Sequence, residues 1–206
     1  MIRDQSLEKF LDQLAGPTAT PGGGGAAAIS GAMGAALVSM ACRLTIGRPR
    51  FSRSEDILQK ALANSEALRE RLLQLAEADR QAFERVMAAY RLPKTTEVEK
   101  TGRRAEVQAA LQEATQTQAQ VAVACAEVIR QTARIIDKVN PNTVGDAAAA
   151  VHLADAGLKI GQSNANINLK LLDDPQVTGQ FQNILVSAFE GVEAARDKAL
   201  ARQNSR

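Results

Sequence analysis

Aromatic side chains are scarce in this chain of 206 residues, which has no tryptophan, one tyrosine and five phenylalanines. Single-stranded nucleic acids are commonly bound by stacking on aromatic side chains, and this chain has few such side chains to offer. The formal net charge is only +2, from 25 basic and 23 acidic residues, and this balance does not suit a dedicated nucleic-acid binder. We therefore expect no nucleic-acid partner.

Histidine and cysteine are also rare. The single histidine, His152, rules out His-based zinc sites, a Ser-His-Asp triad and the Glu-x-x-His pairs of a ferritin-like di-iron centre. The two cysteines, Cys42 and Cys125, lack Cys-x-x-Cys spacing and fit free, buried thiols in a reducing compartment. With no signal-peptide pattern after Met1, the sequence predicts a cytoplasmic protein.

No charged residue occurs between Gly16 and Cys42, and a stretch of this length could cross a membrane. It opens, however, with two prolines and four glycines, and most of the rest is Ala, Gly, Ser and Met. Small residues allow helices to approach closely. We therefore expect a helix packed at the centre of a bundle or at a dimer interface, and no membrane partner.

Alanine makes up roughly a fifth of the chain, well above ordinary usage, and it favours helices over strands. No strand-like alternation is present, and long periodic stretches lie between short helix-breaking sequences. These breaks are Gly16–Gly25, Gly47–Pro49, Leu92–Pro93, Asn140–Asn142 and Asp173–Pro175. The sequence predicts an all-α protein, an antiparallel bundle of long helices, with residues 1–206 forming a single domain.

The stretch before Asn140 gives the clearest helical pattern, with strict 4-3 spacing typical of the core seam of a left-handed bundle. The seam is Val107, Leu111, Ala114, Gln118, Val121, Cys125, Val128, Thr132, Ile135 and Val139. A short amphipathic helix around Leu7–Leu14 is expected before it, and helices of about 25–46 and 54–91. After it we expect helices of about 142–172 and 175–203.

The glycine run Gly22, Gly23, Gly24 and Gly25 is the first candidate site. Four glycines cost much backbone entropy, and glycines that enter a helix leave exposed N–H groups suited to an anion or to a flat ligand. No strand precedes the run, so a dinucleotide-binding fold is not indicated. A flexible bend is the alternative.

Asp79 is the second candidate, because it stands on the apolar stripe of its helix, between Leu75 and Phe83. Burial there would raise the pKa of the carboxyl group, which is what a general acid or base near neutrality needs. The alternative is a structural acid paired with a buried Lys or Arg.

Asp146 is the third candidate, beside an alanine run and about a third of a turn from the solvent-facing stripe that includes His152. An acid in a first helical turn is also an ordinary partner of the helix dipole. Asn164 and Asn168 share one face further along the helix. Asn164 lies about 27 Å from Asp146 along a straight helix, so one reacting atom cannot meet all three side chains within one subunit. Either the ligand is long, or a dimer joins different ends, or the asparagines are structural.

Several motifs together resemble the formiminotransferase-cyclodeaminase family, which includes stand-alone methenyltetrahydrofolate cyclohydrolases. The resemblance covers nearly the whole chain. It rests on Thr20–Ala28, Gly31–Leu37, Leu44–Gly47, Asp79-x-x-Ala82-Phe83, Ala88–Lys94, Asn140–Asn142 and Asn166–Lys170. One departure is that Gly145 precedes Asp146 where the family commonly has a serine.

The resemblance implies an all-helical homodimer that binds a folate substrate and hydrolyses 5,10-methenyltetrahydrofolate to 10-formyltetrahydrofolate. It implies Asp79 and Asp146 as catalytic groups, with no metal ion and no other cofactor. The implied substrate-binding residues are Gly22, Gly23, Gly24, Gly25, Arg48, Lys94, Asn142, Asn164 and Asn168.

Two other functions stay open from the sequence. One is formiminotetrahydrofolate cyclodeaminase activity, in which ammonia leaves. The other, of a different class, is a non-catalytic folate-binding or helical dimerisation protein. An acid on the core stripe and a glycine run without an evident structural need favour an enzyme.

Overall fold

The structure is a computed structural model that describes residues 2–204, and every regular element in that range is helical. The α-helices are α1 (Leu7–Leu14), α2 (Gly23–Arg43), α3 (Glu55–Tyr90), α4 (Glu97–Ile135), α5 (Val144–Leu169), α6 (Pro175–Phe189) and α7 (Val192–Asn204). The short 3-10 helices are η1 (Ile2–Asp4), η2 (Pro49–Ser54) and η3 (Pro141–Thr143).

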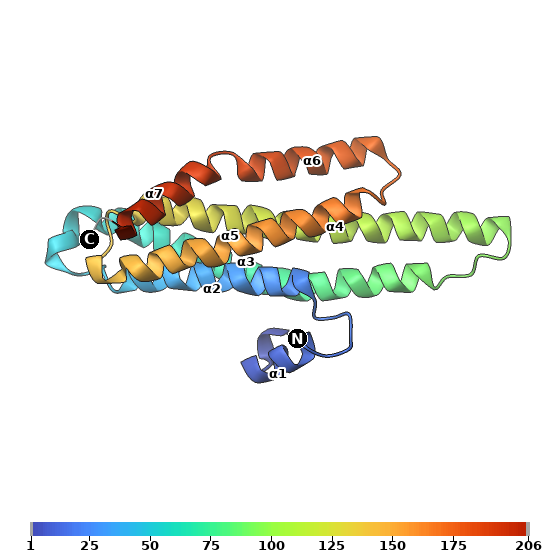
Figure 1. Ribbon diagram of the computed structural model, residues 1–206, viewed down its shortest axis with the longest axis horizontal. Helices are drawn as coiled ribbons and strands as arrows, with labels where there is room; N and C mark the ends of the chain where they lie inside the picture. Colours follow the sequence, from blue (N-terminus) through green and yellow to red (C-terminus); the bar gives the residue numbers. More distant parts are fainter. Residues whose placement is uncertain (1, 205–206) are drawn as a thin grey trace.

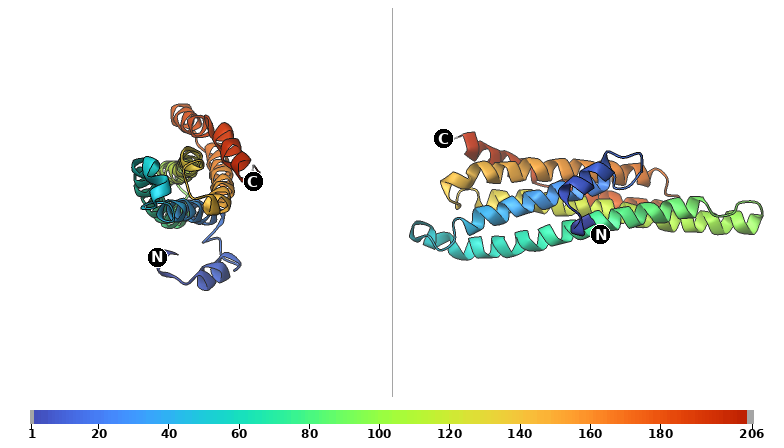
Figure 2. Two further views of the ribbon diagram at one scale, coloured as in Figure 1. Left: turned by 90° about the vertical axis from the view of Figure 1, so that its left-hand side faces the viewer. Right: turned by 90° about the horizontal axis from the view of Figure 1, so that it is seen from below.

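Helices α2, α3, α4 and α5 form a closed bundle in which each packs against the next and α5 returns to α2 (Figure 1). The end-on view in Figure 2 shows the long helices side by side, with α6 and α7 outside them. Both outer helices contact α4, and α7 also contacts α5. The predicted all-helical bundle is confirmed.

The seam on α4 forms a large part of the core, as predicted. Apart from Ala114, every seam residue from Val107 to Val139 is buried. Burying a Val, Leu or Ile side chain contributes about 1.5–3 kcal/mol. Two buried seam residues are polar: Thr132, whose hydroxyl donates to the carbonyl oxygen of Val128, and Gln118, which is only 3% exposed.

Helix α2 is the small-residue helix expected at the centre of the bundle. It is long and apolar enough to cross a membrane, but 61% of its apolar window is buried inside the bundle. It contacts α3, α4 and α5. The approach to α5 is very close, since a Cβ added at Gly157 would lie 2.7 Å from the carbonyl oxygen of Ala27.

The last helix expected from the sequence is two helices rather than one. The chain turns at Gly191, whose φ of 68° lies in the left-handed region that favours glycine. At the end of α6, the guanidinium of Arg130 donates hydrogen bonds to the carbonyl oxygens of Ser187, Ala188 and Glu190. The spacing of apolar residues continues across Gly191, so the sequence pattern does not show that one helix ends there and another begins.

The α3–α4 hairpin extends past the other helices (Figure 1). Helix α2 begins at Gly23, level with Asp79, since a Cβ at Gly24 would collide with the Asp79 carboxylate. Helix α3 continues to Tyr90, about 16 Å further along its axis. Its apolar stripe therefore runs on where α2 no longer covers it.

Candidate active site

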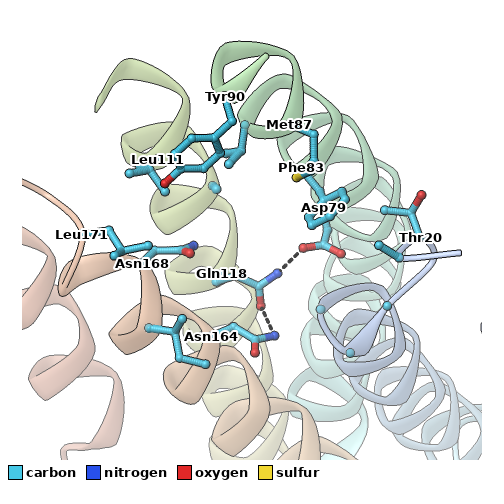
Figure 3. A pocket seen from close by; sticks show the side chains of 17 residues that line it. Thr20, Asp79, Phe83, Met87, Tyr90, Leu111, Gln118, Asn164, Asn168 and Leu171 are labelled. Atoms are coloured by element: carbon cyan, nitrogen blue, oxygen red, sulfur yellow. Dashed lines mark hydrogen bonds between the residues drawn. The ribbon is translucent and has the colours of Figure 1, made fainter. Parts of the chain in front are cut away.

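A cleft of about 400 Å³ opens where α2 begins (Figure 3). It is bounded by the segment before α2 and by α3, α4 and α5. The lining residues are Ala19, Thr20, Gly22, Gly23, Gly24, Asp79, Phe83, Val86, Met87, Tyr90, Leu111, Ala114, Gln118, Asn164, Ile167, Asn168 and Leu171.

The outer part of the cleft has an apolar wall. Phe83, Met87 and Tyr90 come from the overhanging end of α3, and Ile167 and Leu171 come from the end of α5. Tyr90 is 39% exposed and Ile167 is 56% exposed, which is unusual for large apolar side chains in such numbers. Apolar and aromatic walls with a few converging polar groups are typical of sites for small organic ligands.

Asp79 lies at the inner end of the cleft (Figure 3). Burial raises the pKa of its carboxyl group, and this effect outweighs hydrogen bonds from Gln118 and from the backbone of Gly25, which lower it. The direction agrees with the sequence prediction. Within residues 2–204, Asp79 forms no ion pair with Lys or Arg, so the structural pairing considered as the alternative is not present.

Gln118 is the direct partner of Asp79, and sequence reasoning missed it. Its Nε2 donates to Asp79 Oδ1 at 2.5 Å, and its Oε1 accepts from Asn164 Nδ2 at 3.4 Å (Figure 3). The available signal was a glutamine on the core seam of α4, where an unpaired amide would be costly. The chain Asn164–Gln118–Asp79 thus joins three helices at one point.

The glycine run forms the first turn of α2 and packs across this polar chain. Gly22 is the N-cap, with no side-chain cap, and Gly23 faces open space at the cleft. Gly24 and Gly25 are buried, and a Cβ at Gly24 would lie 2.6 Å from Asp79 Cγ and would also collide with the Gln118 amide. Only glycine allows α2 to begin this close to the carboxylate.

The structure thus brings together Gly22–Gly24, Asp79, Asn164 and Asn168 in one cleft, with Gly25 directly behind Asp79. Asn168 lines the cleft one turn beyond Asn164. His152, by contrast, is exposed on the outer face of α5, as the solvent-facing stripe predicts.

Other predicted site residues lie elsewhere within the chain. Arg48 and Asn142 line a separate cavity of about 510 Å³ between η2 and η3, at the other end of α2. Asp146 is half-buried in the first turn of α5, beside η3. Lys94 is exposed in the turn between α3 and α4. None of these four side chains lines the Asp79 cleft, so their roles stay predictions.

No three His, Cys, Asp or Glu side chains gather into a possible metal site within residues 2–204. Both cysteines are buried thiols outside the cleft. Burial raises the pKa of Cys42 to about 11 and that of Cys125 to about 12, so neither supplies a thiolate near neutral pH.

Comparison with known proteins gives consistent matches. The formiminotransferase-cyclodeaminase family model matches residues 6–185. A methenyltetrahydrofolate cyclohydrolase of Methylorubrum extorquens is 47% identical over 174 residues, which cover 84% of each chain. The formimidoyltransferase-cyclodeaminase of Sus scrofa is 31% identical over 205 residues, 96% of this chain but only 37% of that protein.

A solved structure has the same fold along the whole chain. The crystal structure of formiminotetrahydrofolate cyclodeaminase from Thermotoga maritima aligns with a TM-score of 0.90 at 26% identity. The alignment covers 99% of this chain and 98% of that one, so the overhanging α3–α4 hairpin is common to both folds.

Gly24 packs against the hydrogen-bonded side chains of Asp79 and Gln118, so a larger residue there should lower the stability. Replacing Gly24 with Ala should lower the free energy of unfolding by about 1–3 kcal/mol, because the added methyl overpacks a filled site. The matched control is Gly23→Ala, where a Cβ meets nothing within 4 Å. Urea unfolding of both variants measures the difference, and equal stability would contradict the packing described here.

Proposed function

Because the chain belongs to the formiminotransferase-cyclodeaminase family, we propose that its Asp79 cleft binds a one-carbon derivative of tetrahydrofolate and that Asp79 moves the protons of the reaction. The enzyme hydrolyses 5,10-methenyltetrahydrofolate to 10-formyltetrahydrofolate. This agrees with the relative from Methylorubrum extorquens, which matches at 47% identity over most of both chains.

The distribution of charge in the cleft is the main support for this function. Asp79 is the only charged side chain among the residues that line it. The methenyl substrate carries a positive charge shared between N5, the bridging carbon and N10. A single carboxylate in a largely apolar cleft stabilises such a cation far better than it would in water.

The reaction needs proton transfers that one carboxylate can perform. Water attacks the bridging carbon, and Asp79 accepts a proton from it, which leaves a neutral hydroxyl adduct. The bond between that carbon and N5 then breaks, Asp79 returns the proton to N5, and the hydroxyl proton leaves to solvent as the formyl C=O forms on N10. Overall, one proton is released. A raised pKa suits Asp79 to both the base and the acid step.

The cleft walls fit the remainder of a folate. The half-buried Phe83 and the exposed Met87 and Tyr90 offer an apolar surface to the flat rings. Asn164 and Asn168 supply amide groups able to pair with ring N–H and carbonyl groups. The open N–H groups of Gly22 and Gly23 at the start of α2 suit a carboxylate of the tail.

The function is tested with the wild-type protein and Asp79→Asn. The wild type should speed the loss of the near-ultraviolet absorbance of methenyltetrahydrofolate above spontaneous hydrolysis and yield the 10-formyl product. Asp79→Asn keeps the shape but cannot exchange a proton, so the rate should fall on the order of 10²–10⁴-fold. Circular dichroism checks that the variant retains its helices.

Ammonia release from formiminotetrahydrofolate is the competing readout. It is favoured by the structural match to the Thermotoga maritima cyclodeaminase. Rapid ammonia release without accelerated methenyl hydrolysis would assign the chain to that reaction. Near-native turnover by Asp79→Asn would show that Asp79 is structural only.

A homodimer formed through the outer face of α2 is part of the proposal. That face presents Ile29, Met33, Leu37 and Met40 without any charged side chain, and Met33 is 48% exposed. An uncharged, partly exposed apolar face on a long central helix is typical of a subunit interface. A second copy of the chain, packed on the same face, would cover it with matching small and apolar side chains.

Met33→Glu should therefore produce a monomer, because the interface would have to bury an unpaired charge. Light scattering at micromolar concentration measures the mass. Val186→Glu is the control, since Val186 is 64% exposed on α6, away from α2. A monomeric wild type, or a dimeric Met33→Glu variant, would contradict this interface.

A further inference from the structure

Gln118 occupies a position that the fold alone does not explain. It belongs to the apolar seam of α4, and its side chain is almost fully buried, with 3% exposed. A leucine or alanine would pack there without the cost of burying an amide. The amide instead donates one hydrogen bond to Asp79 and accepts one from Asn164.

The hydrogen-bond chemistry fixes which way the amide points. An ionised carboxylate only accepts hydrogen bonds, so Gln118 must present its NH₂ group to Asp79. Its carbonyl oxygen then accepts from the NH₂ group of Asn164. Asn164 thereby holds the amide in the orientation that Asp79 requires.

The same contact distinguishes the two oxygens of Asp79. Oδ1 accepts from Gln118 at 2.5 Å, beneath the first turn of α2. Oδ2 has no side-chain hydrogen bond within residues 2–204 and lies beside the backbone of Gly25. Gln118 therefore engages Oδ1, and Oδ2 is the oxygen without a side-chain partner among these residues.

We propose that Gln118, oriented by Asn164, is the positioning residue for Asp79: it holds Oδ1, so that Oδ2 is the oxygen that exchanges the proton, and it keeps the ionised form accessible. This proposal rests on the proposed function of the cleft. Gln118 acts through Asp79 and is not itself a proton carrier, since an amide does not titrate near neutral pH.

The surroundings of Asp79 are simple enough for its titration to report on Gln118. Along α3, the lining contributes Asp79 and Tyr90 as titratable groups. The lining residues of α2, α4, α5 and the segment before α2 are uncharged and do not titrate. On α3, the neighbours Glu77 and Arg80 pair with each other, outside the cleft. The influences on the Asp79 pKa are burial, Gln118 and the Gly25 backbone.

The test is Gln118→Met, which keeps the length and volume of the side chain but removes the donor. Loss of that hydrogen bond disfavours the carboxylate, so the acid limb of the pH profile of kcat/KM should move up by about one pH unit. kcat at neutral pH should fall on the order of 10–100-fold through misplacement of Asp79, with KM little changed. Carbon-13 NMR of the Asp79 carboxyl group, assigned with Asp79→Asn, should show the same upward pKa shift.

Gln131→Met is the matched control. Gln131 is also a buried glutamine on α4, 4% exposed, but its Oε1 accepts from Arg134 and it does not line the cleft. The same substitution there should alter stability without moving the pH limb or the Asp79 titration. Gln118→Glu is the second variant if Gln118→Met does not fold, and its shared proton should move the limb further up.

A folded Gln118→Met protein with a wild-type pH limb and an unchanged Asp79 titration would overturn the proposal, and so would an equal shift in Gln131→Met. The NMR titration does not depend on turnover. A wild-type protein without hydrolase activity would therefore contradict the proposed function, while the titration would still decide whether Gln118 controls Asp79.

Discussion

The close contact between the first turn of α2 and Asp79 is the constraint on which the site depends. Gly24 removes the side chain that would collide with the carboxylate, so α2 can begin level with the middle of α3. The same start point leaves the rest of α3 uncovered, and the cleft opens there. One backbone contact therefore sets the depth of the cleft, the burial of Asp79 and the exposure of the apolar wall.

Two opposing influences act on the pKa of Asp79 beneath the first turn of α2. Burial raises the pKa of the carboxyl group, while the Gln118 amide and the Gly25 backbone lower it. A raised pKa suits a carboxyl group that must take up and return a proton, and the groups that oppose the rise here are neutral donors in place of a basic side chain. A lysine or arginine at that point would repel the cationic substrate carbon.

Much of the fold follows from the sequence, because periodicity reports burial directly. The seam of α4 and the small-residue helix α2 lie where their patterns predict. Asp79 could be found as an acid on an apolar stripe. Gln118 was hidden because a single polar residue in a heptad resembles a tolerated imperfection, and its meaning depends on which residue lies opposite. The break at Gly191 interrupts no period, since helical spacing resumes directly after it. Asp146, found as an acid beside an alanine run, and Arg48 and Asn142, which the family resemblance implies, lie near the other end of α2 and do not line the Asp79 cleft.

The position of a bound ligand shows whether the Asp79 cleft holds the reacting carbon of the substrate. The measurement is a crystal structure of the protein with a hydrolysis-resistant analogue of 5,10-methenyltetrahydrofolate. We expect the bridging carbon at the inner end of the cleft, within reach of Asp79 Oδ2 directly or through one water molecule. The rings should lie against Phe83 and Tyr90. An analogue bound in the cavity between η2 and η3, with the Asp79 cleft empty, would contradict this prediction.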